Sequence, residues 1–150
     1  MIGSEFITWK ASGAENPARR MSQLSFDAVG RKAKADWLAL FAEDAVVEDP
    51  VGPSMFDPEG RGHRGKAAIE AFWDTVIANV PAYRFTVHDS FANGPHCANV
   101  ATITCTFDDG STADTDLVTV YRLADDGRIA SLRAHWEMDR MLATITSSER

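Results

Sequence analysis

The chain has 150 residues, a length that suits one domain, and its 45% hydrophobic and 25% charged residues exclude a disordered chain and a membrane protein. Its formal net charge of -7 and its scattered lysines and arginines disfavour nucleic acid as a partner. No apolar run approaches the roughly 18 residues of a membrane-spanning helix. Cys97 and Cys105 lack the spacing of a disulfide framework or a zinc site. We therefore expect a cytoplasmic protein without a metal, a cofactor or a membrane span.

The N-terminal segment is expected to lie outside the domain. Residues 1–6 read like a vector-derived leader, and we expect residues 1–16 to form a leader or a disordered N-terminus. The first helix is predicted for residues 17–32, because Asn16 can cap a helix. Pro17 suits the first helical position, where its missing N–H would be unpaired in any case.

Two further helices are predicted, with a strand and a long loop between them. Apolar residues at helical spacing indicate a short helix at residues 37–41, and the same period indicates an amphipathic helix at residues 66–80. The strand is expected at residues 45–49. The density of proline and glycine in residues 52–66 indicates a loop, and loops of this length are often functional.

The second half of the sequence changes to a period of two. This alternation predicts strands at residues 83–88, 97–107, 115–123 and 129–136, separated by turn sequences such as Asn93-Gly94. Helices followed by a meander of antiparallel strands indicate an α+β fold. We expect three N-terminal helices to pack on one face of a curved, mostly antiparallel sheet.

Asp49 is the residue that the local pattern singles out. Residues 45–49 favour a strand, and Pro50 and Gly52 stop it, because proline cannot donate to a β-ladder and glycine accepts turn conformations. An acid before a proline commonly caps a turn, which is the simplest interpretation of Asp49. The alternative is a functional carboxylate at the end of a strand.

The order of the elements and three sequence segments resemble the ketosteroid isomerases and their nuclear transport factor 2-like (SnoaL-like) superfamily. These segments are FAEDAVVEDPVG at residues 41–52, HRGKAAIEAFW at residues 63–73 and GRIASLRAHW at residues 127–136. The resemblance covers residues 17–142 and implies a cone-shaped α+β barrel there, which leaves residues 143–150 as a C-terminal tail. It also implies a homodimer that forms through the outer face of the sheet.

In ketosteroid isomerases the aspartate that Asp49 matches is a general base, which carries a proton between two substrate carbons through a dienolate. This transfer needs a carboxylate in an apolar pocket and hydrogen-bond donors for the dienolate oxygen. The family's two donors, a tyrosine and an aspartate, align with Ser25, which precedes Phe26, and with Thr119. The resemblance therefore implies a retained base, with weaker hydroxyl donors from Ser25, Thr119 or Tyr121.

Strand alternation groups the other candidates for a ligand pocket, since residues two apart share a face. The expected substrate-binding residues are Ser25, Phe26, Leu117, Thr119, Tyr121, Leu132 and Trp136. Asp116 is expected on the opposite face of its strand. Five aromatic residues suit a pocket for a flat apolar ligand such as a steroid, and they equally suit a core: Phe41, Phe56, Phe72, Trp73 and Trp136.

The function implied by the resemblance is a steroid Δ5-isomerase-like protein that binds a steroid or a similarly flat polycyclic ketone. A non-catalytic module that binds steroids or other hydrophobic ligands is an alternative, because the family's two donors are absent. A polyketide cyclase-like enzyme is another alternative, since it needs one acid or base in a similar pocket. An epoxide hydrolase-like enzyme is disfavoured, because residues 102–104 carry no arginine or acid.

Overall fold

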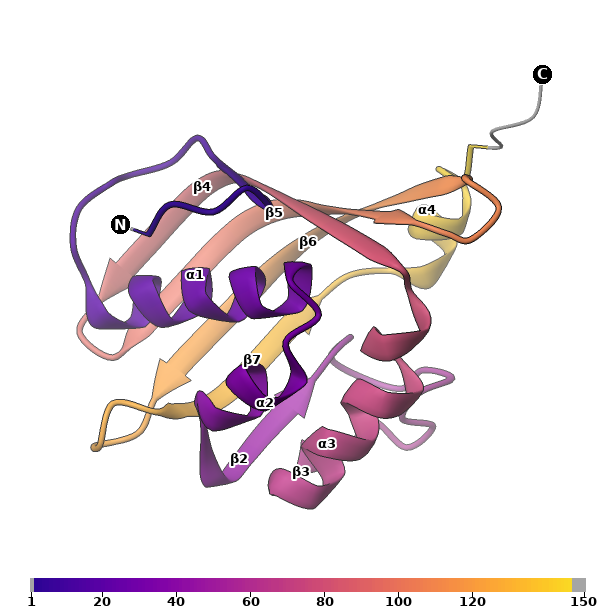
Figure 1. Cartoon of the computed structure of the whole chain (residues 1–150). Coiled ribbons are helices and arrows are strands. Elements are labelled where there is room, and N and C mark those ends of the chain that lie inside the picture. The colour runs from indigo at the N-terminus through magenta and orange to yellow at the C-terminus, as the bar shows by residue number, and fades with distance from the viewer. Residues whose placement is uncertain (1, 147–150) are drawn as a thin grey trace.

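A seven-stranded sheet curves around helices in the computed structural model, which describes residues 2–146 (Figure 1). The helices are α1 (Pro17–Gly30), α2 (Lys34–Ala39), α3 (Lys66–Thr75) and α4 (Met138–Leu142), with a 3-10 turn, η1, at Ile77–Asn79. The strands are β1 (Ile7–Trp9), β2 (Phe41–Glu48), β3 (His63–Arg64), β4 (Ala82–Asn93), β5 (His96–Thr106), β6 (Thr112–Leu123) and β7 (Ile129–His135).

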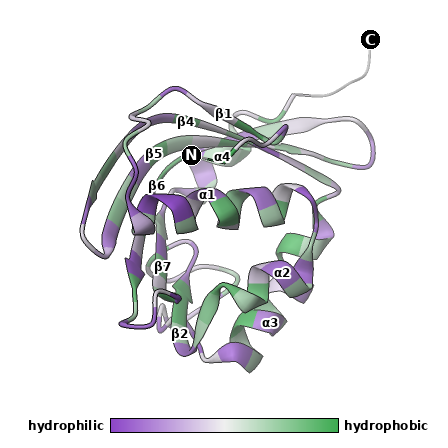
Figure 2. Ribbon diagram, turned by 60° about the vertical axis from the view of Figure 1, so that its left-hand side comes forward, coloured by the Kyte–Doolittle hydropathy of each residue, from purple (hydrophilic) through white to green (hydrophobic). Residues whose placement is uncertain are grey.

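The strands lie in the order β1-β4-β5-β6-β7-β2-β3, so the described sheet is open and ends at β1 and β3. Neighbouring strands run antiparallel except for β1 beside β4 and β2 beside β7, which are parallel pairs. The long strands β4, β5 and β6 bend around α1, and α2 and α3 lie beside it (Figure 2). The predicted α+β class, with three N-terminal helices on a curved and mostly antiparallel sheet, is confirmed.

The first helix begins as the sequence predicts. The Asn16 side chain accepts hydrogen bonds from the backbone N–H groups of Ala18 at 2.8 Å and Arg19 at 2.9 Å. The helix ends at Gly30, before the expected residue 32. A Cβ atom at position 30 would lie 2.5 Å from the Phe6 side chain. The N-terminal segment can therefore pack against the end of α1 only because residue 30 is a glycine.

Part of the segment that was expected to be a leader or disordered belongs to the sheet. Residues 7–9 form β1, which pairs in parallel with β4, and the N–H of Phe85 donates to the carbonyl of Phe6 at 2.8 Å. A strand of three residues is too short to show alternation in the sequence, which explains why it was missed. At the other end, Thr146 pairs with Thr112, whereas residues 147–150 of the expected tail lie outside the described residues.

The helix predicted at residues 37–41 is displaced toward the N-terminus, because Phe41 already belongs to β2. The pairing of β2 with β7 is irregular between Phe41 and Val46. This irregularity buries Phe41, Ala42 and Ala45 together, at a spacing that imitates one face of a helix. The prediction was therefore wrong about where this helix ends and where the strand begins.

Other boundaries shift for similar reasons. The helix predicted at residues 66–80 ends at Thr75 and continues as η1, and β4 extends to Asn93 through a register shift after Val87. Neither β3 nor α4 was predicted, because two and five residues carry no readable period. In residues 2–146, no helix has both the length and the apolar character needed to cross a membrane.

Aromatic contacts under α1 and α2 hold the helices on the sheet. The Phe26 ring stacks on Phe85 with centroids 4.9 Å apart, and it makes a T-shaped contact with Tyr121 at 6.1 Å. Trp37 of α2 packs against Phe41 at 4.7 Å and against Trp73 of α3 at 5.3 Å. These contacts fix α1 against β4 and β6, and so they also fix the residue that precedes Phe26.

Candidate functional site

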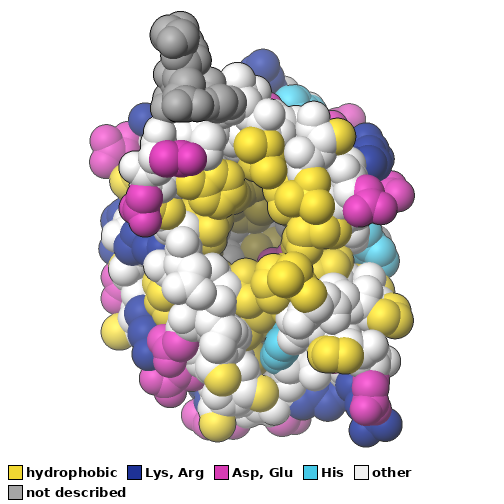
Figure 3. Space-filling view, turned by 90° about the vertical axis from the view of Figure 1, so that its right-hand side faces the viewer, with side chains coloured by type: hydrophobic (Ala, Val, Ile, Leu, Met, Phe, Trp, Pro, Cys, Tyr) yellow, Lys and Arg dark blue, Asp and Glu magenta, His cyan; other side chains and the backbone are white. Residues whose placement is uncertain are grey.

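A cavity of about 490 Å³ opens between the helices and the inner face of the sheet. Its lining includes all of the expected catalytic and substrate-binding residues: Ser25, Phe26, Asp49, Leu117, Thr119, Tyr121, Leu132 and Trp136. Of the other aromatic candidates, Phe56 and Phe72 line the cavity, whereas Phe41 and Trp73 belong to the core. Figure 3 looks into a hollow that is rimmed by hydrophobic side chains, with acidic surface visible inside it. Among the described residues, Asp49 is the one acid in this lining, and no lysine or arginine accompanies it.

Asp49 follows the last residue of β2 and lies beside the end of β7. The N–H of Val51 donates to the carbonyl of Ala134 at 2.8 Å, which fastens the chain beyond Asp49 to β7. The indole Nε1–H of Trp136 donates to Oδ1 of Asp49 at 2.5 Å. Asp49 is therefore an oriented, partly buried carboxylate whose hydrogen-bond partner is a neutral donor.

The surroundings of Asp49 hold its pKa above the usual range. Burial raises the pKa of this carboxyl group from 3.8 to about 6, and the hydrogen bond from Trp136 opposes part of that rise. At neutral pH the group is mainly a carboxylate, yet its conjugate acid lies close in free energy. A general base that must take a proton and return it needs such a pKa.

Replacing Trp136 by phenylalanine is expected to raise the pKa of Asp49 above 6, by about one pKa unit. The aromatic ring remains, but the N–H that stabilises the charged form is lost. The measurement is the pH dependence of the Asp49 carboxyl ¹³C resonance. Trp9→Phe is the matched control, because the Trp9 indole bonds the carbonyl of Ser12 instead. An unchanged or lowered pKa in the Trp136 variant would contradict this interpretation.

Ser25 and Tyr121 form a hydrogen-bonded pair in the cavity lining. The Ser25 hydroxyl oxygen accepts from the Trp37 indole N–H at 3.1 Å and from the Tyr121 hydroxyl at 3.0 Å. Burial raises the pKa of Tyr121, so its phenol stays protonated. Because an indole only donates and the Tyr121 proton is used in the bond to Ser25, the proton of the Ser25 hydroxyl remains available to a ligand.

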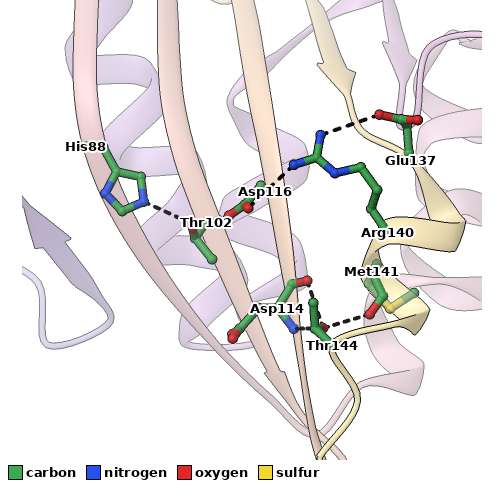
Figure 4. Close-up of polar contacts among 8 residues, drawn as sticks. All are labelled: His88, Thr102, Asp114, Asp116, Glu137, Arg140, Met141 and Thr144. Carbon is green, nitrogen blue, oxygen red and sulfur yellow. Dashed lines mark hydrogen bonds and ion pairs between the residues drawn. The ribbon is translucent and has the colours of Figure 1, made fainter.

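Thr119 lies on the same inner face as Tyr121, and Asn99 donates from Nδ2 to its hydroxyl oxygen at 3.4 Å. Asp116 points to the outer face, as its place in the alternation predicts. There its carboxylate accepts from the Thr102 hydroxyl at 2.7 Å (Figure 4). No acid therefore stands at the position of the family's oxyanion aspartate.

The rim of the cavity contains residues that the sequence analysis did not single out as a group. They come from the long loop, from the chain around β5 and from α4: Met55, Phe56, Cys105, Phe107, Met138, Met141 and Leu142. Two signals pointed to the loop part of this rim: the proline and glycine residues within 52–66, and Phe56 as one of the aromatic candidates. Helix α4 gave no signal, since none of its residues is buried and its length is one turn and a half.

Contacts with β6 hold α4 at the rim (Figure 4). The Thr144 hydroxyl accepts from the N–H of Asp114 at 2.8 Å and donates to the carbonyl of Met141 at 2.7 Å. Arg140 lies 3.8 Å from the carboxylate of Asp116. These contacts are exposed, so they position the helix with little stabilisation.

A second hollow of about 650 Å³ lies on the outer face of the sheet, with His88, Asp116 and Arg140 in its lining. It does not include Asp49, so the inner cavity is the candidate site. Within residues 2–146, no three His, Cys, Asp or Glu side chains are placed to hold a metal ion. The expected homodimer stays a prediction.

An α+β cone, with one acid among the described residues of a largely apolar cavity, is typical of proteins that bind small ligands. Comparison with known proteins identifies the family. The family model of the SnoaL-like domain matches residues 23–132, so the chain belongs to the SnoaL-like family. A curated relative, the steroid Delta-isomerase of Nocardioides simplex, is 33% identical over 119 residues, which make up 79% of this chain and 88% of that protein.

Solved structures agree with this assignment. The Delta 5-3-ketosteroid isomerase from Mycobacterium sp. is 37% identical with a TM-score of 0.78, and the match covers 88% of this chain and 98% of that one. A Mycobacterium tuberculosis protein in complex with estradiol-17beta-hemisuccinate is 34% identical with a TM-score of 0.77, covering 88% and 99%. The resemblance of this chain to ketosteroid isomerases is therefore confirmed at the level of family and fold.

Proposed function

We propose that the protein is a steroid Δ5-isomerase-like protein, which binds a steroid or a similarly flat polycyclic ketone and uses Asp49 to move a proton. The observation that carries this proposal is a carboxyl group with a pKa raised to about 6, the one acid among the described residues that line a largely apolar cavity. The steroid named with one structural neighbour and the isomerase names of two other relatives support the same ligand class.

The proposed reaction needs no second reactant. The Asp49 carboxylate takes a proton from the carbon between the ketone and the isolated double bond of a 5-ene-3-ketosteroid, and the electron pair moves to the ketone oxygen. The resulting dienolate takes the same proton back from Asp49 at the far carbon of its diene. The double bond thereby moves into conjugation, and the carboxylate is regenerated.

The dienolate oxygen requires donors while it carries negative charge. In the proposed binding mode it faces the free proton of the Ser25–Tyr121 pair and the hydroxyl of Thr119. Losing one oxyanion donor commonly lowers turnover by roughly a hundred- to a thousandfold. Aliphatic hydroxyls are weaker acids than a phenol or a carboxylic acid, so we propose that turnover is slow compared with family members that keep both acidic donors.

That weakness also supports the second candidate function, a binding module without turnover. Both candidates share the ligand, and they differ in whether Asp49 transfers a proton. Ligand binding therefore tests the shared part of the proposal, and turnover separates its two forms.

Calorimetric titration with a 4-ene-3-ketosteroid tests the binding part. We expect one ligand per chain, and about tenfold weaker binding for the same steroid without its 3-oxygen, because the hydroxyl donors then lose their acceptor. The two ligands have nearly the same apolar surface, so their comparison isolates the carbonyl group. Absence of binding for both steroids would contradict the proposal.

A further inference from the structure

A chain of polar side chains runs behind the cavity wall, from α1 across β4 and β5 to β6. Its members, all buried, are Arg19, Ser22, Ser90, Cys97, Asn99 and Thr119. Only Thr119 of these six lines the described cavity. Because buried polar groups must satisfy one another, the donors and acceptors in this chain have little freedom to exchange roles.

The α1 end of the chain fixes which way the Asn99 amide faces. The hydroxyl of Ser22 donates to the backbone carbonyl of Arg19 at 2.7 Å, so its one proton is already used. Ser22 can therefore only accept from Asn99, whose Nδ2 lies 3.0 Å away. The Asn99 oxygen then faces Cys97, whose thiol sulfur lies 3.4 Å from it.

This orientation sets the role of Thr119. The same Asn99 Nδ2 lies 3.4 Å from the Thr119 hydroxyl oxygen, and the two residues are direct partners in the pairing of β5 with β6. An amide nitrogen only donates, so Thr119 accepts this bond and keeps its own proton. Asn99 is 0% exposed, which leaves no route for solvent to replace it.

We propose that Asn99 is a positioning residue, which turns the Thr119 hydroxyl proton toward the carbonyl oxygen of the ligand. This inference rests on the proposed function, since it assigns the ligand's ketone to the Thr119 end of the cavity. With its proton directed into the cavity, the Thr119 hydroxyl favours a ligand that places a hydrogen-bond acceptor, such as a ketone or an enolate oxygen, at this end of the cavity. Arg19 and Ser90 stand at the other end of the polar chain: the Arg19 guanidinium donates from Nε to the Ser90 hydroxyl at 3.0 Å, and this hydroxyl lies 3.6 Å from the Cys97 sulfur.

Asn99→Asp tests the inference, because a carboxylate accepts and draws the Thr119 proton away from the cavity. We expect ketosteroid binding to weaken about tenfold, with no change for the steroid that lacks the 3-oxygen. In a Thr119→Val background the same change is expected to alter ketone binding by less than about twofold. Asn93→Asp, at the exposed end of β4, is the matched control and leaves both ligands unaffected.

Two results would show that Asn99 acts on packing alone and would overturn the inference. One is that Asn99→Asp weakens the binding of both steroids equally. The other is that it weakens ketosteroid binding by the same factor in the Thr119→Val background. If Asn99→Asp does not fold, Asn99→Leu takes its place in the same cycle. It leaves Thr119 without its donor, and we expect about threefold weaker ketone binding that again depends on Thr119.

A ligand-free measurement separates failure of this inference from failure of the proposed function. Neutron diffraction of the deuterated protein shows the hydroxyl deuteron of Thr119 directly. We expect it to point into the cavity, with both Asn99 amide deuterons directed at Ser22 and Thr119. A deuteron on the line from Thr119 to Asn99 would overturn the inference, even if the wild-type protein binds the ketosteroid.

Discussion

Asp49→Asn is expected to reduce isomerisation of a 5-ene-3-ketosteroid by about a thousandfold or more while ligand binding is retained. Asparagine has the size of aspartate and still offers an oxygen to the Trp136 indole, so the cavity keeps its shape. The amide cannot take up and return a proton, so the substitution removes the proposed proton transfer but retains the cavity and ligand binding. The measurement is the growth of the ultraviolet absorbance of the conjugated ketone, followed at about pH 8, where the wild-type Asp49 is a carboxylate.

Asp116→Asn is the matched control for that experiment. It makes the same chemical change on the outer face of β6, where the carboxylate accepts from Thr102 and lines no part of the inner cavity. Its other contact, at 3.8 Å from Arg140, is exposed and contributes little to the position of α4. Its rate is expected to equal that of the wild-type protein. A rate in the Asp49 variant within a few fold of wild type would remove Asp49 from the mechanism.

The same Asp49→Asn substitution is expected to stabilise the folded protein at about pH 8. The pKa of Asp49 is about 6 in the folded protein against an ordinary 3.8, so the folded state disfavours the charged form. Above about pH 6, this difference lowers the free energy of unfolding of the wild-type protein by up to about 3 kcal/mol. The asparagine side chain of the variant carries no charge at any of these pH values, so the variant escapes the penalty.

The difference in stability between the Asp49→Asn variant and the wild-type protein is expected to grow with pH. Below about pH 4 the carboxyl group is protonated in both states, and wild type and Asp49→Asn should unfold at similar urea concentrations. As the pH rises from about 4 to about 6, the free energy of unfolding of the wild type falls below that of the variant. Above this range the difference between them is constant. Asp116→Asn again serves as the control. A difference that does not change with pH, or a variant less stable than wild type in alkaline buffer, would contradict the proposed burial of charge.

Strand alternation and the family resemblance were enough to predict from the sequence the candidate site residues that line the cavity. Thr119 and Tyr121 were placed on an inner face by counting in twos, and Asp116 was placed outside for the same reason. These predictions succeeded because β6 pairs with β5 without a bulge. A single extra residue in that strand would have exchanged its two faces.

Features that depend on contacts between distant segments could not be predicted from the sequence. Asn99 gave no local signal, because its role comes from the pairing of β5 with β6 and from the position of Ser22 on α1. Strand β1 and helix α4 are too short to show a period. The helical spacing around Phe41 was misleading, since an irregular strand can bury the same positions.

The wild-type rate of 5-ene to 4-ene conversion as a function of pH decides most directly whether Asp49 transfers a proton. We expect conversion above the rate in buffer, with kcat/KM rising with pH through about 6 and constant above it, because Asp49 acts as a carboxylate. A protein that binds the 4-ene-3-ketosteroid but converts no 5-ene substrate above the buffer rate at any pH would contradict the proposed catalysis and leave a binding module.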